Sequence, residues 1–228
     1  MNLKTRHWGR IALIVAGVLV AGLILTFFLR VMLWEKDYYE QKKGSERALP
    51  EHVEIEGVVD ETPITEEQIV EYTVAPGSPR YLTIGKIDVS QARIIQVGTL
   101  KNGEMGTPNN IFDAGWYNQT NRPGEGGKII IDGHNGGPTK SGIFKRLPEL
   151  ENGDIVSIER GDGMKFDYRV VESVSREVKT GAASTEMLKA FQTPNVETVV
   201  LITCTGEWLE NESTYSQRQF VYAELVTE

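Results

Sequence analysis

The sequence predicts a mainly β domain folded as a closed barrel with a few short helices, preceded by a single membrane-spanning helix. Two observations predict the β domain. From Arg80 onward the chain consists of short β-branched runs separated by Gly, Pro and Asn turns. Only two short stretches of that region have a helical pattern. The membrane helix is predicted by a long uncharged apolar run among the first thirty residues.

The apolar run Ile11–Leu29 contains no charged residue, and Thr26 is its one polar member. A helix of this length rises about 28 Å, close to the hydrocarbon thickness of a bilayer. Cations precede the run, whereas those behind it are mixed with acids, so the positive-inside rule places the N-terminus in the cytoplasm. A cleaved signal peptide is the alternative, but the run is long for one and no clear cleavage site follows. We expect an uncleaved anchor and an extracellular domain.

An acidic stretch follows the apolar run. Between Glu35 and Ala75 there are twelve Asp or Glu residues against four Lys or Arg, which gives −8 for this stretch alone. Because few large apolar residues accompany these charges, the stretch cannot bury enough surface to fold by itself. The expected regions are a cytoplasmic N-terminus (1–10), a transmembrane anchor (11–33), an acidic extracellular linker (34–78) and a catalytic β-barrel (79–228).

Composition excludes several kinds of function. The formal net charge is −8 and no basic stripe is present in the predicted β domain, so binding to nucleic acid has no electrostatic support. The glycines at 124, 126 and 127 lack the Lys-Ser/Thr that completes a phosphate loop, and they indicate a turn. A single cysteine excludes an internal disulfide, and outside the cell it is either a buried small hydrophobe or a reactive thiol. We expect no cofactor and no metal.

Seven segments have the alternation or β-branched content of strands. They are Tyr81–Ile87, Ala92–Val97, Lys128–Asp132, Ile155–Arg160, Phe166–Val178, Thr198–Thr203 and Gln219–Val226. Two stretches, Ser141–Leu147 and Ser184–Phe191, predict helices, the second with Ser184 as its cap. Strands in this number indicate a closed barrel or a sandwich, and the barrel is favoured because a closed sheet hides its edges.

Three residues able to carry chemistry each lie at the end of a predicted strand. His134, the one histidine of the predicted β domain, follows an apolar strand, Cys204 closes a second one, and Arg218 precedes the last. Each residue has an ordinary interpretation by itself: a packed thiol, a solvated histidine and a surface cation. Loops at strand ends often display functional side chains from a rigid sheet. The three residues could therefore form one site if their strands are neighbours.

The motifs around these residues resemble those of the sortase family. Leu201-Ile202-Thr203-Cys204 is similar to the family signature Thr-Leu-x-Thr-Cys, with Val200 in place of its first threonine. Gly133-His134 after an apolar strand resembles the family histidine motif, and Arg218 lies fourteen residues after the cysteine, as the family arginine does. The resemblance covers about Pro79 to Glu224. Gly115-Trp116-Tyr117 and Pro123-Gly124 look most like the class E and class F branches.

The resemblance implies an eight-stranded β-barrel and a transpeptidase that acts on sorting-signal-bearing surface proteins. Cys204 would attack the Thr–Gly bond of an LPxTG-like signal and form a thioacyl intermediate, which an amine of a cell-wall precursor or a pilin would release. His134 would act as the acid and base, and Arg218 would hold the oxyanion or the substrate backbone. Thr203 is a candidate substrate-binding residue. Asp132 is left out, because its side chain is expected to point elsewhere on the strand.

Three other functions remain to be weighed. A membrane-anchored cysteine peptidase would use the same Cys–His pair with water as acceptor, although the papain-type motif is absent. An L,D-transpeptidase would need a Ser-x-Gly-Cys signature that the chain lacks. A non-catalytic tethered β domain, acting as a scaffold or adhesin, would need no reactive thiol at all.

Overall fold

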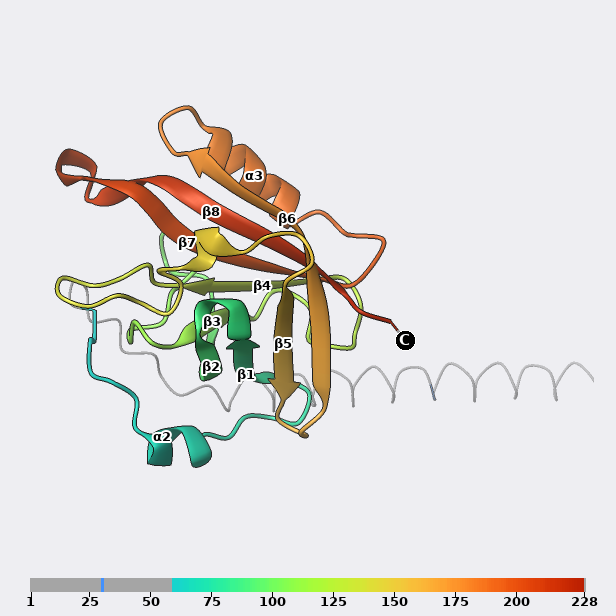
Figure 1. Cartoon of the computed structure of the whole chain (residues 1–228). Coiled ribbons are helices and arrows are strands. Elements are labelled where there is room, and N and C mark those ends of the chain that lie inside the picture. The colour runs from blue at the N-terminus through green and yellow to red at the C-terminus, as the bar shows by residue number, and fades with distance from the viewer. Residues whose placement is uncertain (1–29, 31–58, 228) are drawn as a thin grey trace, which may run out of the picture. The chain divides into compact units, whose positions relative to one another are not determined.

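The computed structural model describes Arg30 and residues 59–227, and residues 79–225 form a closed barrel of eight strands (Figure 1). The order around the barrel is β1-β2-β3-β4-β7-β8-β6-β5, and β5 pairs back to β1. The predicted mainly β barrel is therefore confirmed. The strands are β1 (Pro79–Ile84), β2 (Val89–Val97), β3 (Ala114–Tyr117), β4 (Lys128–Gly133), β5 (Ile155–Arg160), β6 (Lys165–Glu177), β7 (Thr198–Leu209) and β8 (Thr214–Leu225).

Strand β3 is the one strand that the sequence did not predict. It has four residues, Ala-Gly-Trp-Tyr, which is too short for a periodic pattern. It is a strand because it lies between two others, running parallel to β2 and antiparallel to β4. The pairing of its neighbours, which is a tertiary feature, therefore decides its conformation.

The helices are short. They are α2 (Glu66–Val70), α3 (Ala182–Ala190) and the 3-10 turns η1 (Gly85–Ile87), η2 (Leu147–Glu149) and η3 (Glu210–Glu212). Helix α3 matches the helix expected at Ser184–Phe191. It begins directly after Gly181, which is the N-cap residue and has a positive φ of 74°. The prediction that Ser184 caps this helix was therefore wrong. The prediction of a helix at Ser141–Leu147 is also wrong. The backbone N–H groups of Ile143 and Phe144 donate to the carbonyls of Ile111 and His134, outside this stretch, so it forms turns.

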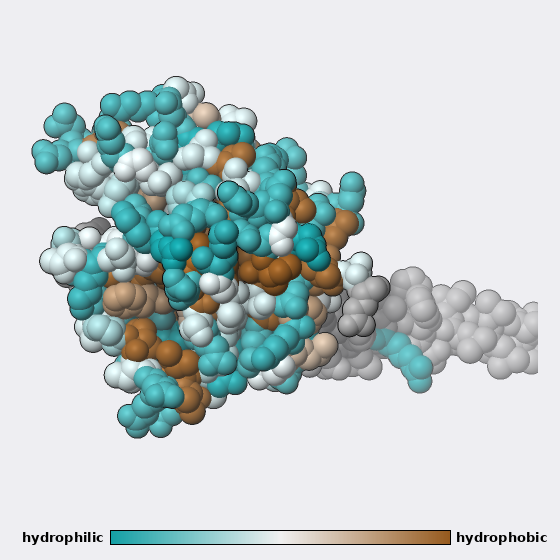
Figure 2. Space-filling model, viewed as in Figure 1, coloured by the Kyte–Doolittle hydropathy of each residue, from teal (hydrophilic) through white to brown (hydrophobic). Residues whose placement is uncertain are grey.

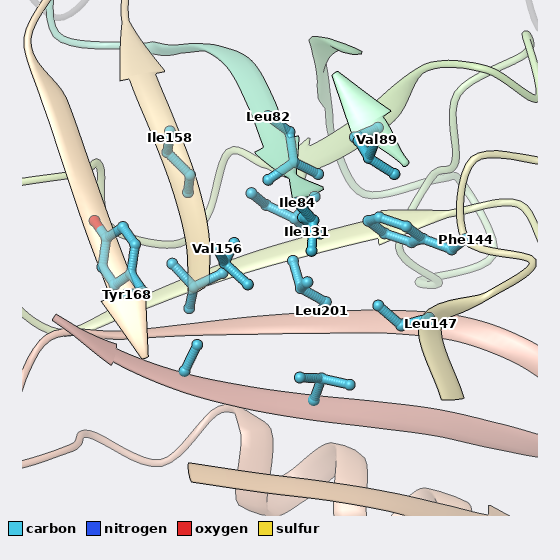
Figure 3. Close-up of a cluster of buried hydrophobic side chains, with 14 of the residues drawn as sticks. Leu82, Ile84, Val89, Ile131, Phe144, Leu147, Val156, Ile158, Tyr168 and Leu201 are labelled. Carbon is cyan, nitrogen blue, oxygen red and sulfur yellow. The ribbon is translucent and has the colours of Figure 1, made fainter. Parts of the chain in front are cut away.

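Strand β4 and the first half of β7, through Thr203, are buried on both faces. Their alternate residues Ile131 and Leu201 point into the barrel interior, where Figure 3 shows them among side chains from other strands. The residues between them, Ile130, Val200 and Ile202, belong to a second apolar cluster on the outer face of the sheet. Continuous β-branched runs are typical of parallel strands covered on both sides, which explains the sequences Ile-Ile-Ile and Val-Val-Leu-Ile.

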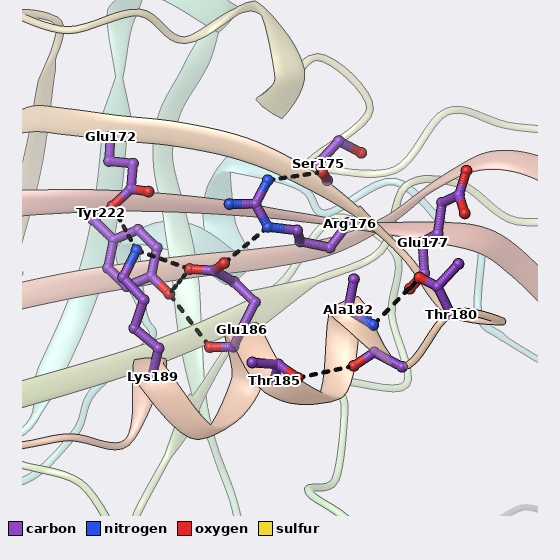
Figure 4. Close-up of polar contacts among 11 residues, drawn as sticks. Glu172, Ser175, Arg176, Glu177, Thr180, Ala182, Thr185, Glu186, Lys189 and Tyr222 are labelled. Atoms are coloured by element: carbon purple, nitrogen blue, oxygen red, sulfur yellow. Dashed lines mark hydrogen bonds and ion pairs between the residues drawn. The ribbon is translucent and has the colours of Figure 1, made fainter.

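Helix α3 covers this outer cluster, lying over β6 and β8 (Figure 1). The buried carboxylate of Glu186 fixes it, accepting hydrogen bonds from Arg176 Nε at 2.9 Å and Tyr222 Oη at 2.8 Å, with Lys189 Nζ 2.9 Å away (Figure 4). Burial alone would raise the pKa of Glu186, but these hydrogen bonds together lower it. A charged carboxylate therefore ties the helix to the sheet.

The surface seen in Figure 2 is mostly hydrophilic, with apolar residues in separate patches. Among the residues that the structure describes, no helix combines the length and apolar character needed to cross a membrane. The predicted anchor, Ile11–Leu29, lies outside those residues. The last part of the predicted linker is described and contacts the barrel: for example, Tyr72 Oη donates to the carbonyl of Ile94 at 2.6 Å.

We predict that Phe144→Ala lowers the free energy of unfolding by about 3–5 kcal/mol, because this ring is fully buried in the interior cluster and its loss leaves a cavity. Denaturant titration of the purified domain would measure the loss. Leu188→Ala is the control: its side chain is 72% exposed, so the change should stay within about 0.5 kcal/mol. Equal losses in both variants would contradict the packing argument.

Candidate active site

The register of three strands brings His134, Cys204 and Arg218 together. In the parallel pair β4–β7, Asp132 lies opposite Ile202, so two residues further along each chain His134 comes level with Cys204. In the antiparallel pair β7–β8, Cys204 lies directly opposite Arg218. All three have the parity of the outer cluster, so their side chains share the outer face of the sheet. The three residues thus occupy neighbouring positions at one edge of the sheet, and their catalytic roles stay a prediction.

The ring of His134 is held by the loop between β2 and β3. Its Nε2 lies 2.7 Å from the carbonyl oxygen of Pro108. A carbonyl can only accept a hydrogen bond, so Nε2 must carry a proton, and in the neutral ring Nδ1 is then the unprotonated nitrogen. The loop therefore fixes the tautomer in which Nδ1 can take up a proton.

Two glycines give the backbone around His134 its shape. A Cβ atom on Gly133 would lie 2.6 Å from the ring of Phe144, which packs directly against the strand end. A Cβ atom on Gly142 would collide with the carbonyl oxygen of His134. Packing therefore requires glycine directly before His134, because the buried phenyl ring occupies the space of a side chain at position 133.

The guanidinium of Arg218 is fixed by its own hairpin. Nη1 donates to the carbonyls of Tyr215 at 3.1 Å and Gln217 at 3.0 Å, and Nη2 donates to Thr214 Oγ1 at 2.7 Å. Arginine has five N–H donors, so the described residues accept three and leave Nε and one Nη2 hydrogen for another partner. A fixed cation with two remaining donors suits an oxyanion or a peptide carbonyl.

A sequence model of the sortase domain family matches residues 82–226, which is more than half of the chain and includes all three residues. The chain belongs to the sortase family. No curated protein sequence gives a significant match. The family's members are cysteine transpeptidases, as the resemblance of the motifs implied.

Several solved sortase structures are similar to this chain at low identity. Sortase C-1 from Actinomyces oris matches with a TM-score of 0.49 and 21% identity, over 75% of this chain and 90% of that one. Sortase A from Corynebacterium diphtheriae, as a lid mutant, matches with a TM-score of 0.48 and 22% identity, over 67% of this chain and 72% of that one. For sortase C1 of GBS Pilus Island 1 the TM-score is 0.48 and the identity 19%, over 65% of this chain. That match spans 64% of the C1 protein, less than two thirds of its length.

The side chain of Thr203 does not lie on the outer face of the sheet that carries His134, Cys204 and Arg218. It is 3% exposed and has the parity of Leu201, which faces the barrel interior. Its hydroxyl donates to the carbonyl of Gly133 at 2.7 Å. This bond ties the end of β7 to the end of β4, directly before the cysteine and the histidine. Its role as a substrate-binding residue stays a prediction, whereas its contact with β4 is structural.

The side chain of Asp132 lies on a different face of the strand from the one expected. Residues two apart on a strand share a face, so Asp132 lies on the face of His134 instead of pointing elsewhere. Its carboxyl group is buried, and Oδ1 has no hydrogen-bond partner within residues 59–227. Burial raises the pKa of this carboxyl well above its ordinary value. The spacing of two residues was the signal in the sequence that could have placed it.

Arg176 was missed by the sequence analysis. In the β6–β8 pair it lies opposite Arg218, which makes a row of four side chains across the outer face: His134, Cys204, Arg218 and Arg176. Its Nε donates to Glu186, so its charge is neutralised locally. Only the pairing of strands distant in sequence reveals this position, and Arg218 is left as the cation that acts on the thiol.

Burial raises the pKa of the Cys204 thiol above its ordinary value, and the charge of Arg218 acts in the opposite direction. A charge on Asp132 would raise it further. Desolvation is the largest of these effects. The resting thiol is therefore mostly protonated at neutral pH, and the charge of Arg218 limits how far burial raises its pKa.

We predict that the alkylation of Cys204 by iodoacetamide, followed against pH, has a midpoint above that of an exposed cysteine, because the thiolate is the reactive form. Arg218→Gln should move the midpoint to higher pH, since the stabilising cation is lost. Because the chain has one cysteine, mass spectrometry reports this residue alone.

The control for this experiment is Arg169→Gln, which removes the same charge from an exposed position at the other end of β6. It should leave the midpoint where it is in the wild type. A midpoint that is unchanged or lower in Arg218→Gln would show that the guanidinium does not act on the thiol.

Proposed function

We propose that this sortase cleaves an LPxTG-like sorting signal through a thioacyl intermediate on Cys204 and joins the surface protein to an amine of the cell wall or a pilin. The observation that carries the proposal is the position of Cys204 between His134 and Arg218 on three hydrogen-bonded strands, inside a domain of the sortase family. A nucleophile, an acid–base group and a permanent cation are the groups that acyl transfer needs.

The first half of the reaction forms the thioacyl enzyme. The Cys204 thiol gives its proton to Nδ1 of His134, and the sulfur attacks the threonine carbonyl carbon of the signal. The remaining N–H groups of Arg218 would face the oxyanion of the tetrahedral intermediate. When this intermediate collapses, the threonine–glycine bond breaks, and the imidazolium returns its proton to the leaving amine.

The second half reverses these steps with a new amine. The acceptor amine attacks the thioacyl carbon and loses a proton to His134. The collapse of the second intermediate expels the sulfur of Cys204, which takes that proton back from the imidazolium. The products are an amide bond and the free thiol, so no external oxidant or cofactor is consumed. Since desolvation disfavours the thiolate, His134 has to accept the thiol proton as the substrate binds.

The location of the enzyme forms part of the proposal. The apolar run Ile11–Leu29 would anchor the chain in the cell membrane with the N-terminus in the cytoplasm, and the acidic stretch would carry the catalytic domain outside. The partners would then be surface proteins with a sorting signal and an amine of a cell-wall precursor or pilin. The similarity to classes E and F stays a prediction, since relatives under 25% identity do not decide a class.

We predict that a sorting-signal peptide gives a thioacyl adduct on Cys204 by mass spectrometry, and that adding an amine converts it to an amide. Cys204→Ala should give neither product while keeping its melting temperature. His134→Ala should react at least about 10²-fold more slowly, as expected when a general acid–base group is lost.

The same experiment separates the alternatives. Hydrolysed peptide without amide at any amine concentration would favour the cysteine peptidase. An unmodified thiol and intact peptide under all conditions would favour the non-catalytic scaffold. Either result would overturn the transpeptidase proposal.

We predict that protease added to intact, wall-stripped cells digests the catalytic domain, because the cations before Ile11 place it outside. Immunoblotting with an antibody to the domain would follow the loss, and a cytoplasmic protein should stay intact as the control. Full protection of the domain would mean the opposite orientation.

A further inference from the structure

Residues 60–62, here called the N-terminal strap, bind the loop that follows His134. The carboxylate of Glu61 accepts hydrogen bonds from the backbone N–H groups of Thr139 and Lys140, both at 2.8 Å, and from the Thr139 hydroxyl. Lys140 Nζ in turn donates to the carbonyl of Glu61 at 3.0 Å. Bonds to a charged acceptor are stronger than those between neutral groups, so this carboxylate is a firm clamp on the loop.

The other side of the strap binds the loop that holds the ring of His134. Asp60 exchanges backbone hydrogen bonds with Asn109 and Ile111, at 2.8 and 3.0 Å. The side-chain amide of Asn110 donates to Asp60 Oδ2 at 3.1 Å and to the carbonyl of Thr62 at 2.9 Å. This loop supplies the Pro108 carbonyl to His134 Nε2. The strap thus joins the loop that follows His134 to the loop that holds its ring.

The local sequence is shaped to this contact. A Cβ atom on Gly137 would come 2.5 Å from Glu61 Oε1, so the glycine leaves room for the carboxylate. The hydrogen bond from the Thr139 side chain is the main cause that lowers the pKa of Glu61. A lowered pKa means that the clamp is fully charged at neutral pH and is lost only as the pH falls through that value.

We propose that Glu61 is a positioning residue, which fixes the imidazole of His134 for proton transfer by clamping the loop behind it. The inference rests on the proposed function. Glu61 acts through backbone groups five and six residues after the histidine. Its effect should therefore fall on the rate of the chemical step, with binding of the peptide unchanged.

The test uses the full chain in detergent, with Glu61→Ala and Glu61→Gln as variants. Both should lower kcat about tenfold with KM unchanged, because a shift of about 1 Å in a catalytic group can cost ~10² in rate. Asp162→Asn is the matched control, since this carboxylate is exposed and accepts hydrogen bonds from Arg160 and Met164 in its own turn. It should turn over like the wild type.

A double variant decides whether Glu61 acts through His134. If it does, adding Glu61→Ala to His134→Ala should cause no further loss, since the two changes remove one function. Losses that multiply would overturn the proposal, as would a wild-type or increased kcat in Glu61→Ala. A raised rate would mean that the strap restrains the enzyme.

A substrate-free measurement separates this inference from the proposed function. The pH profile of Cys204 alkylation should change in Glu61→Ala toward that of His134→Ala, while Asp162→Asn keeps the wild-type profile. An unchanged profile in Glu61→Ala would overturn the positioning role even if no peptide is ever processed. If the wild type forms no amide but the profile moves as expected, the substrate proposal fails and the clamp on His134 stands.

Discussion

The parallel pairing of β4 with β7 is the constraint on which the site depends. Parallel strands run in the same direction, so the residues at the ends of the two apolar runs come level at one edge of the sheet. The antiparallel partner β8 then adds Arg218 beside Cys204. The Thr203 hydroxyl, bonded to the carbonyl of Gly133, locks the two strand ends together. Backbone register therefore places Cys204 beside Arg218, and the loop after β4 adds His134 next to them.

Much of this arrangement could be predicted from the sequence, because seven of the eight strands carry a β-branched or alternating pattern and the three reactive residues lie at strand ends. What could not be predicted depends on partners distant in the chain. Four residues become β3 only between β2 and β4. Residues 141–147 form turns instead of the expected helix, because the N–H groups of Ile143 and Phe144 donate to carbonyls outside the segment. Arg176 joins the row only through the pairing of β6 with β8.

Charge and burial oppose each other around the thiol. The outer cluster next to Cys204 is apolar and buried, and burial disfavours a thiolate. Of the two arginines in the row, Arg176 is paired with Glu186, so its charge fixes α3 instead of activating the sulfur. Within the described residues the Oδ1 atom of Asp132 has no hydrogen-bond partner, and burial raises the pKa of this carboxyl, which favours its neutral form. Burial and the charge of Arg218 therefore act in opposite directions on the pKa of the Cys204 thiol, and burial is the larger effect.

Because Cys204, Arg218 and Arg176 project from strands, the site tolerates changes in chain length unevenly. One residue inserted between Thr198 and Cys204 would turn the cysteine to the opposite face, where the interior cluster lies. The η3 turn at the tip of the β7–β8 hairpin has no such constraint, since it lies beyond the last paired residues, Leu209 and Thr214. Length variation among descendants of this gene should therefore gather at the tip, and a library of single-residue insertions scored for amide formation would map that boundary.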